Sequence, residues 1–247
     1  MIRKKLIAGN WKMNKTPDET YGFLKEISSE INCSGKEVAV FPPFISLAGA
    51  AKALAGTDIF LGAQNMHYEA EGAYTGEISA EMLIAAGCSY VLIAHSERRL
   101  YFSETSPAIN LKINKALSAG IKPVLCVGEN LEMREAARTF EIISAQLRDG
   151  LENVSGSEEL IIAYEPVWAI GTGKNATAGE AGEACTFIRG ELNKIYGSLS
   201  EKIRILYGGS VKASNAESIL STDNIDGVLV GGASLTRDFI GIANYDS

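Results

Sequence analysis

Short apolar segments alternate with amphipathic ones along nearly the whole chain. Apolar runs with the length of a buried strand occur eight times, at residues 6–11, 38–41, 59–63, 90–94, 123–127, 160–164, 203–207 and 228–230. Between them, apolar residues recur at helical spacing, as at Ile109, Ile113 and Leu117. Strand and helix are therefore expected to alternate, in the order that builds a parallel sheet.

The expected helices carry signals for their ends. Thr16-Pro17-Asp18-Glu19 combines a capping hydroxyl, a proline at the first helical position and a glutamate that completes a capping box. Thr177 and Glu180 repeat the box. Gly120 and Gly197 follow helical runs and suit the left-handed position that ends a helix.

Eight strand and helix units in 247 residues predict an α/β fold, a closed (β/α)8 barrel formed as a single domain by residues 1–247. An open, doubly wound sheet is the alternative. Such a sheet usually has a G-x-G-x-x-G turn after its first strand, whereas residues 9–12 read Gly-Asn-Trp-Lys. The closed barrel is therefore favoured.

Charge and composition exclude several classes of protein. The chain has 23 Lys and Arg against 30 Asp and Glu, which argues against duplex nucleic acid or an anionic membrane as a partner. No apolar run approaches the roughly 20 residues that span a bilayer, and the one after Lys5 is too short for a secretory signal. The 4 Cys are scattered and there are only 2 His, so we expect no metal site and reduced thiols in a cytoplasmic protein.

Polar and glycine residues follow the expected strands, at the end of a barrel where active sites form. They are Asn10, Lys12, Gln64, Asn65, His95, Ser96, Glu97, Glu165, Gly208, Gly209, Ser210, Gly231 and Gly232. One mouth of the barrel is thus expected to hold an amide, a lysine, a histidine and two carboxylates.

Glu165 ends an apolar strand, where desolvation favours the neutral acid and makes the anion a stronger base. A structural pair with a nearby lysine is the alternative. The apolar segment 166–174, which begins at Pro166 and contains Gly171 and Gly173, favours the catalytic role because it resembles a lid that excludes water.

Two further side chains have catalytic potential. If residues from Ser96 onward open a helix, the positive end of its dipole disfavours an imidazolium and keeps His95 neutral. Lys12 suits a Schiff base, an oxyanion partner or a solvated cation. The glycine pairs after strands seven and eight suit a phosphate site built from backbone N–H groups, although tight turns also use such pairs.

These motifs, over essentially the whole chain, are similar to those of the triosephosphate isomerase family. The resemblance rests on Gly9-Asn10-Trp11-Lys12, Ala94-His95-Ser96-Glu97-Arg98-Arg99, Cys126-Val127-Gly128-Glu129, Ala163-Tyr164-Glu165-Pro166-Val167-Trp168, Tyr207-Gly208-Gly209-Ser210 and Gly231-Gly232-Ala233-Ser234. It implies a TIM barrel that interconverts dihydroxyacetone phosphate and D-glyceraldehyde 3-phosphate through an enediolate, without a metal or organic cofactor.

The resemblance also implies a role for each site residue. Glu165 would be the base, and neutral His95 would polarise the carbonyl. Lys12 and Asn10 would stabilise the oxyanion, with Glu97 supporting Lys12. The phosphate would be held by Gly171, Ser210, Gly231 and Gly232, with Asn10 and Lys12 completing the substrate site.

The long segment 64–79 implies, by the same resemblance, a homodimer in which Thr75 reaches the neighbouring site. Asn175, Ala178 and Ser103 depart from residues frequent in the family, namely Thr or Val, Pro, and Gly. Two other functions compete: an aldolase that uses Lys12 as a Schiff base, and a barrel retained as a binding protein after catalysis was lost.

Overall fold

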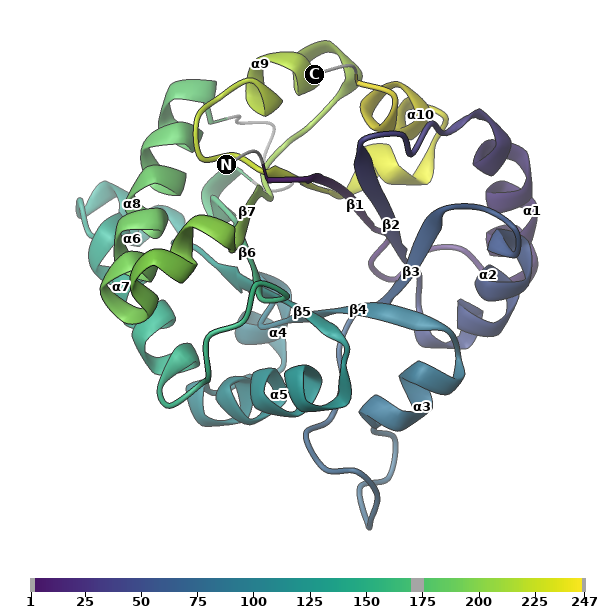
Figure 1. The fold of residues 1–247 in the computed structure, drawn as a ribbon, viewed down its shortest axis with the longest axis horizontal. Helices are drawn as coiled ribbons and strands as arrows, with labels where there is room; N and C mark the ends of the chain where they lie inside the picture. The colour runs from purple at the N-terminus through teal and green to yellow at the C-terminus, as the bar shows by residue number, and fades with distance from the viewer. Residues whose placement is uncertain (1–2, 170–175, 246–247) are drawn as a thin grey trace.

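The structure, a computed structural model, describes residues 3–169 and 176–245. These residues form a closed barrel of parallel strands surrounded by helices (Figure 1). The strands, each hydrogen-bonded to the next along the chain and the last to the first, are β1 (Lys5–Asn10), β2 (Lys36–Phe41), β3 (Ile59–Ala63), β4 (Cys88–Ile93), β5 (Lys122–Val127), β6 (Ile161–Tyr164), β7 (Arg204–Tyr207) and β8 (Gly227–Val230). The predicted (β/α)8 barrel is confirmed, with strand bounds shifted by at most two residues.

The helices pack outside the strands. They are α1 (Pro17–Ile27), α2 (Leu47–Leu54), α3 (Ala80–Ala85), α4 (Ser96–Tyr101), α5 (Ser106–Ala119), α6 (Leu131–Glu135), α7 (Thr139–Leu151), α8 (Ala178–Tyr196), α9 (Ala213–Leu220) and α10 (Asp238–Ala243). Short 3₁₀ turns are η1 (Ser28–Glu30), η2 (Phe44–Ser46), η3 (Val167–Ala169), η4 (Gly197–Lys202) and η5 (Gly232–Leu235). Within the two described ranges, no helix combines the length and the apolar content needed to cross a bilayer.

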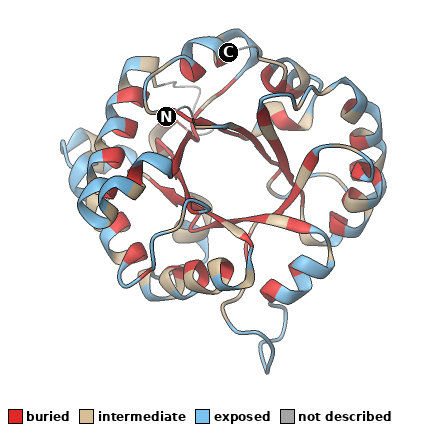
Figure 2. Ribbon diagram, in the orientation of Figure 1, coloured by how far each residue is buried: buried red, intermediate tan, exposed pale blue. Residues whose placement is uncertain are grey.

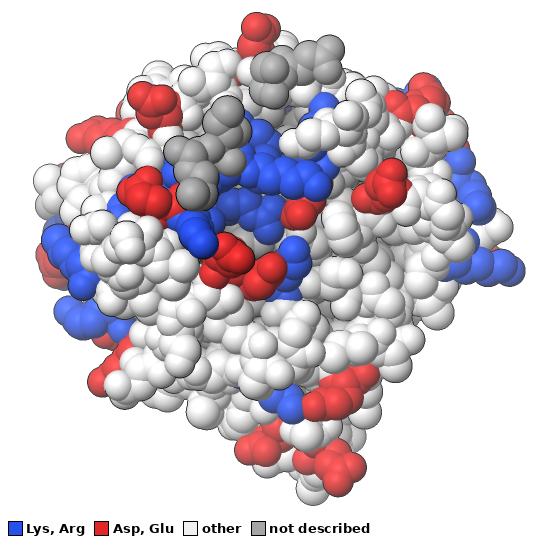
Figure 3. Space-filling model, viewed as in Figure 1, with Lys and Arg blue, Asp and Glu red and all other residues white. Residues whose placement is uncertain are grey.

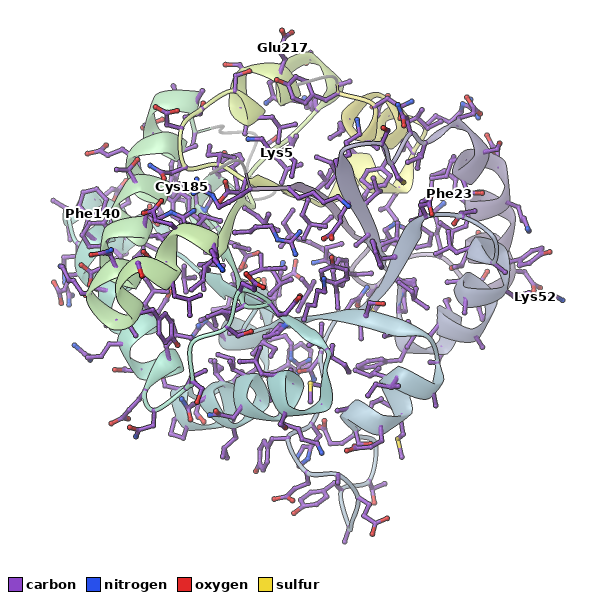
Figure 4. The ribbon with its side chains drawn as sticks, in the orientation of Figure 1. Lys5, Phe23, Lys52, Phe140, Cys185 and Glu217 are labelled. Carbon is purple, nitrogen blue, oxygen red and sulfur yellow. The ribbon has the colours of Figure 1, made fainter. Side chains whose placement is uncertain are left out.

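Alternation along the strands produces two hydrophobic cores. Leu6 and Ala8 of β1 point into the barrel and join its inner cluster, whereas Ile7 belongs to the cluster between the strands and the helices. Figure 2 shows the buried strands and the exposed outer sides of the helices. Figure 4 shows Lys52 of α2 and Glu217 of α9 pointing outward, while Cys185 of α8 is fully buried.

The capping signals act as predicted, with one exception. Both boxes form, at Thr16 with Glu19 and at Thr177 with Glu180. Gly120 ends α5 with left-handed dihedral angles (φ 79°, ψ 17°). Gly197 ends α8 at φ 57° and ψ −136°, so it needs a positive φ but is not in the left-handed helical region that we expected.

Ser103 lies just beyond α4 at a φ of 51°, which explains why glycine is frequent there in the family that the sequence resembles. We expect Ser103→Gly to raise the free energy of unfolding by about 0.5–1 kcal/mol, because it relieves a conformation that side chains disfavour. Urea denaturation at a fixed protein concentration measures this.

The matched control is Ser28→Gly, at the end of α1, where φ is −63° and glycine brings no relief. Equal unfolding midpoints for the two variants would contradict the prediction.

Candidate active site

The carboxyl ends of the strands open onto a cavity of about 480 Å³. Its lining includes seven of the predicted site residues: Asn10, Lys12, His95, Glu165, Ser210, Gly231 and Gly232. Glu97 lies behind Lys12, in contact with its ammonium. Gly171 and residues 170–174 of the predicted lid lie outside the described residues, as does Asn175.

Lys12 follows β1 in a left-handed conformation (φ 54°) that neighbouring amides hold in place. The Asn10 side-chain oxygen accepts the Lys12 backbone N–H at 3.0 Å, and the Gln64 amide donates to the Lys12 carbonyl at 2.8 Å. The Lys12 ammonium lies 2.7 Å from the carboxylate of Glu97. This ion pair suits a cation held ready for an oxyanion rather than an amine that forms a Schiff base.

His95 is the N-terminal cap of α4, so the helix that we expected after strand four does begin here. Its Nδ1 accepts the backbone N–H of Glu97 at 3.3 Å, and its Nε2 lies 2.8 Å from Oε1 of Glu165. A nitrogen that accepts a hydrogen bond carries no proton, so this geometry fits the neutral ring with its proton on Nε2.

Glu165 is buried and fully engaged. Besides His95, it accepts the backbone N–H of Ser96 at 2.9 Å through Oε2. Burial favours the neutral acid, but His95, the Ser96 N–H and the charge of Lys12 together hold the pKa of Glu165 below its usual value. The desolvation that we expected from sequence is therefore present, but in this arrangement the neighbouring groups outweigh its effect on the pKa of Glu165.

The same pairing acts on His95 in the opposite direction. Burial disfavours the imidazolium, but the adjacent carboxylates of Glu165 and Glu97 outweigh it and raise the pKa of His95. Among the neighbouring charges, that of Glu165 acts most strongly on this ring, and it favours the imidazolium, in the direction opposite to the helix dipole that we invoked from sequence.

Glycines allow Glu165 to reach this position. A Cβ on Gly128, directly after β5, would lie 1.8 Å from the carbonyl oxygen of Glu165. A Cβ on Gly208 would lie 3.1 Å from Cγ of Glu165. The sequence assigned Gly208 to a phosphate site and gave Gly128 no role, because the close approach of β5 and β6 is a tertiary contact.

The opposite wall of the cavity is open. A Cβ on Gly232, where η5 begins, meets nothing within 4 Å, and one on Gly231 meets only Cε of Lys12, at 3.9 Å. Ser210 is fixed through its carbonyl, which accepts from the side chain of Asn215 at 3.1 Å. The absence of side chains at the glycines leaves room for an anion close to the backbone.

Glu129 holds the start of the predicted lid and was not recognised from sequence as a site residue. Its buried carboxylate accepts from the Trp168 indole at 2.9 Å and from the Tyr164 hydroxyl at 3.2 Å. The Arg134 guanidinium lies 4.0 Å from the centroid of the Trp168 indole. The only signal for Glu129 in the sequence is that a carboxylate follows a strand, as at Glu97 and Glu165.

Cys126 lies beside Glu165 in the inner core of the barrel. Complete burial and the nearby carboxylate raise the pKa of its thiol, which keeps it protonated and poorly nucleophilic. Among the described residues, no group of three or more His, Cys, Asp or Glu side chains is arranged to hold a metal ion.

Comparison with known proteins gives one consistent answer. The family model for triosephosphate isomerase matches residues 5–246. The triosephosphate isomerase of Alkaliphilus oremlandii is 50% identical over 99% of this chain and 100% of its own, and that of Carboxydothermus hydrogenoformans is 52% identical over 95% of each. The crystal structure of the Bartonella henselae triosephosphate isomerase superposes with a TM-score of 0.89 at 42% identity, covering 98% of both chains.

The contact of Gly128 with Glu165 is testable. We expect Gly128→Ala to destabilise the fold by about 1–3 kcal/mol, because a methyl group there displaces the backbone of Glu165. Chemical denaturation measures the loss.

Gly22→Ala is the control, since a Cβ at Gly22 of α1 meets nothing within 4 Å and alanine favours a helix. A Gly128→Ala protein as stable as Gly22→Ala would refute the packing argument.

Proposed function

The chain belongs to the triosephosphate isomerase family, and we propose that Glu165 and His95 move the protons of its isomerisation. The reaction interconverts dihydroxyacetone phosphate and D-glyceraldehyde 3-phosphate. It transfers a proton between two adjacent carbons, so it needs a base near the carbon and a donor near the oxygen. The observation that supports this assignment is the buried contact of the two side chains at the cavity wall, where Nε2 of His95 lies 2.8 Å from Oε1 of Glu165.

In the substrate-free site these two groups satisfy each other. A substrate that enters between them separates the carboxylate from the ring and removes the main cause that lowers the pKa of Glu165 and raises that of His95. Burial then acts on each alone, which strengthens Glu165 as a base and favours neutral His95 as a hydrogen-bond donor. The backbone N–H of Glu97 keeps the donor proton on Nε2.

Lys12 and Asn10 stabilise the negative charge that develops on the substrate oxygen. Lys12 has a defined position because its backbone is bound by Asn10 and Gln64 and its ammonium by Glu97. A cation that is already in position stabilises the developing negative charge more than a mobile cation does, because no reorganisation is needed when the charge appears. Glu97 acts through Lys12 and is therefore a positioning residue.

The phosphate occupies the open wall at Ser210, Gly231 and Gly232. The catalytic pair and this wall line one cavity of about 480 Å³, which suits a small phosphorylated substrate. Gly171 completes the proposed phosphate site from the segment outside the described residues. Trp168, held by Glu129, anchors the start of the lid that we expect from sequence.

Replacement of the base tests the catalytic assignment. We expect Glu165→Gln to lower kcat by at least about 10² to 10⁴, because the amide cannot accept the carbon-bound proton. A coupled assay of glyceraldehyde 3-phosphate conversion measures this, with circular dichroism to confirm the fold.

Glu159→Gln is the control, since this residue lies at the other end of the barrel. An unchanged rate for Glu165→Gln would remove it as the base. Borohydride trapping of a substrate adduct on Lys12 would favour an aldolase instead.

We also propose a homodimer. Segment 64–79 projects beyond the barrel (Figure 1). Within it, the ring of His67 stacks on Tyr68 at a centroid distance of 4.3 Å and contacts the tilted ring of Tyr74 at 4.4 Å. Large apolar side chains are exposed in four consecutive βα segments: Met13, Ile45, Met82 and Phe102. Large exposed apolar side chains in neighbouring segments of a protein are typical of an interface.

The dimer has a testable mass and a testable dependence on this surface. Analytical ultracentrifugation is expected to give twice the chain mass of 26.4 kDa. Thr75→Arg combined with Met82→Arg is expected to shift the protein to monomers and to lower activity, because Thr75 is proposed to reach the neighbouring site.

Ile195→Arg, at an exposed apolar position on α8, is the control and is expected to stay dimeric. A fully active monomer would overturn the proposal.

We propose a cytoplasmic location. All four cysteines are free thiols, and three of them are buried. Thiols of this kind suit a reducing compartment.

A further inference from the structure

A second cavity, of about 320 Å³, opens at the amino ends of the strands, opposite the active site. Five cationic side chains line it, against three glutamates: Arg3, Lys4, Lys122, Lys202 and Arg204. Figure 3 looks onto this end and shows Lys and Arg gathered around the centre of the face. The excess of positive charge is notable because the whole chain carries a net charge of −7.

The floor of the cavity is rigid. The Arg204 side chain is only 8% exposed and donates to Oε2 of Glu37 at 2.5 Å. The hydroxyl of Tyr90, inside the barrel, donates to the same oxygen. Lys122 lies with its ammonium 5.5 Å from the centroid of the Tyr90 ring. Arg204 therefore has a defined position at the base of the cavity, with Lys122 beside it.

The lysines at the rim of the cavity form ion pairs with exposed glutamates only, or none, within the part of the chain that the structure describes. Lys122 pairs with Glu159 at 2.9 Å and Lys202 with Glu158 at 3.4 Å, and both glutamates are at least half exposed. Exposed pairs of this kind contribute little, so an incoming anion displaces the carboxylates easily. Lys4 is exposed and has no ion pair with any of the residues that the structure describes. Three lysines can thus converge on one ligand.

We propose that this cavity binds a compact anion with two or more phosphate groups. The volume is at the small end of ligand pockets, which excludes bulky ligands from full burial. Several linked phosphates can bind several of the cations at once and so displace the glutamates from the lysines. A single phosphate binds fewer cations and is therefore expected to bind more weakly. Arg204 offers the planar donor that phosphate oxygens accept, and the lysines supply charge at the rim.

Titration calorimetry with inorganic triphosphate tests the site, with saturating glycerol 3-phosphate present to occupy the active-site phosphate wall. We expect wild-type protein to bind triphosphate and Lys4→Gln combined with Lys202→Gln to bind it at least tenfold more weakly. Binding is also expected to weaken with added salt. The kcat and KM of the double variant are expected to equal those of the wild type, because both lysines lie at the far end of the barrel.

The control replaces two other exposed lysines, Lys25→Gln on helix α1 with Lys52→Gln on helix α2, of which Lys52 is labelled in Figure 4. It removes the same charge and is expected to change triphosphate affinity less than twofold. Absence of binding to the wild type, or equal weakening in the two double variants, would overturn the proposal. Loss of isomerase activity in Glu165→Gln has no bearing on it, so the two proposals fail separately.

Discussion

The buried contact between Glu165 and His95 is the interaction on which the active site depends. Burial disfavours the charged form of each side chain in this position, and the contact with the other side chain opposes that effect. The surrounding backbone is arranged to allow the contact: Ser96 donates an N–H to Glu165, and Gly128 leaves space for its carbonyl. In the mechanism that we propose, the substrate replaces this contact, and burial then acts on two separated groups. The proposal thus gives the same few atoms a part in both the resting site and the reaction.

The barrel carries this arrangement because its two ends have different tasks. Inward-facing apolar residues such as Leu6, Leu92 and Leu206 fill the middle of the barrel and separate the two mouths. At the carboxyl mouth, loops and glycines leave a cavity with side chains that approach one another from different strands. At the amino mouth, Arg204 and Glu37 close the interior with an ion pair. Within the barrel, charged side chains therefore lie at the two ends, where partners and solvent are available.

Much of the fold and site was predictable from sequence, and the failures have specific causes. Strand positions, capping boxes and the residues that follow the strands depend on local periodicity, which the chain displays openly. Gly128 and Glu129 were not assigned roles from sequence, because both act through tertiary contacts. Gly128 allows the close approach of β6, and Glu129 accepts a hydrogen bond from Trp168. Gly197 was placed in the wrong dihedral region since both regions require a positive φ. Each of these failures concerns a contact or a torsion angle that neighbouring residues do not determine.

By itself, the sequence determined the alternation that closes the barrel, the mouth at which polar residues collect, and the family to which the chain belongs. Only the tertiary structure decided how those residues act on one another. The protonation of Glu165 is the clearest case, because its apolar strand favours the neutral acid while His95, from a different strand, favours the anion. Burial raises the pKa of Glu165 and His95 lowers it, and the effect of His95 depends on its distance from the carboxylate. Distances between residues 70 positions apart are set by the closed sheet, and so the sign of the result is a property of the fold.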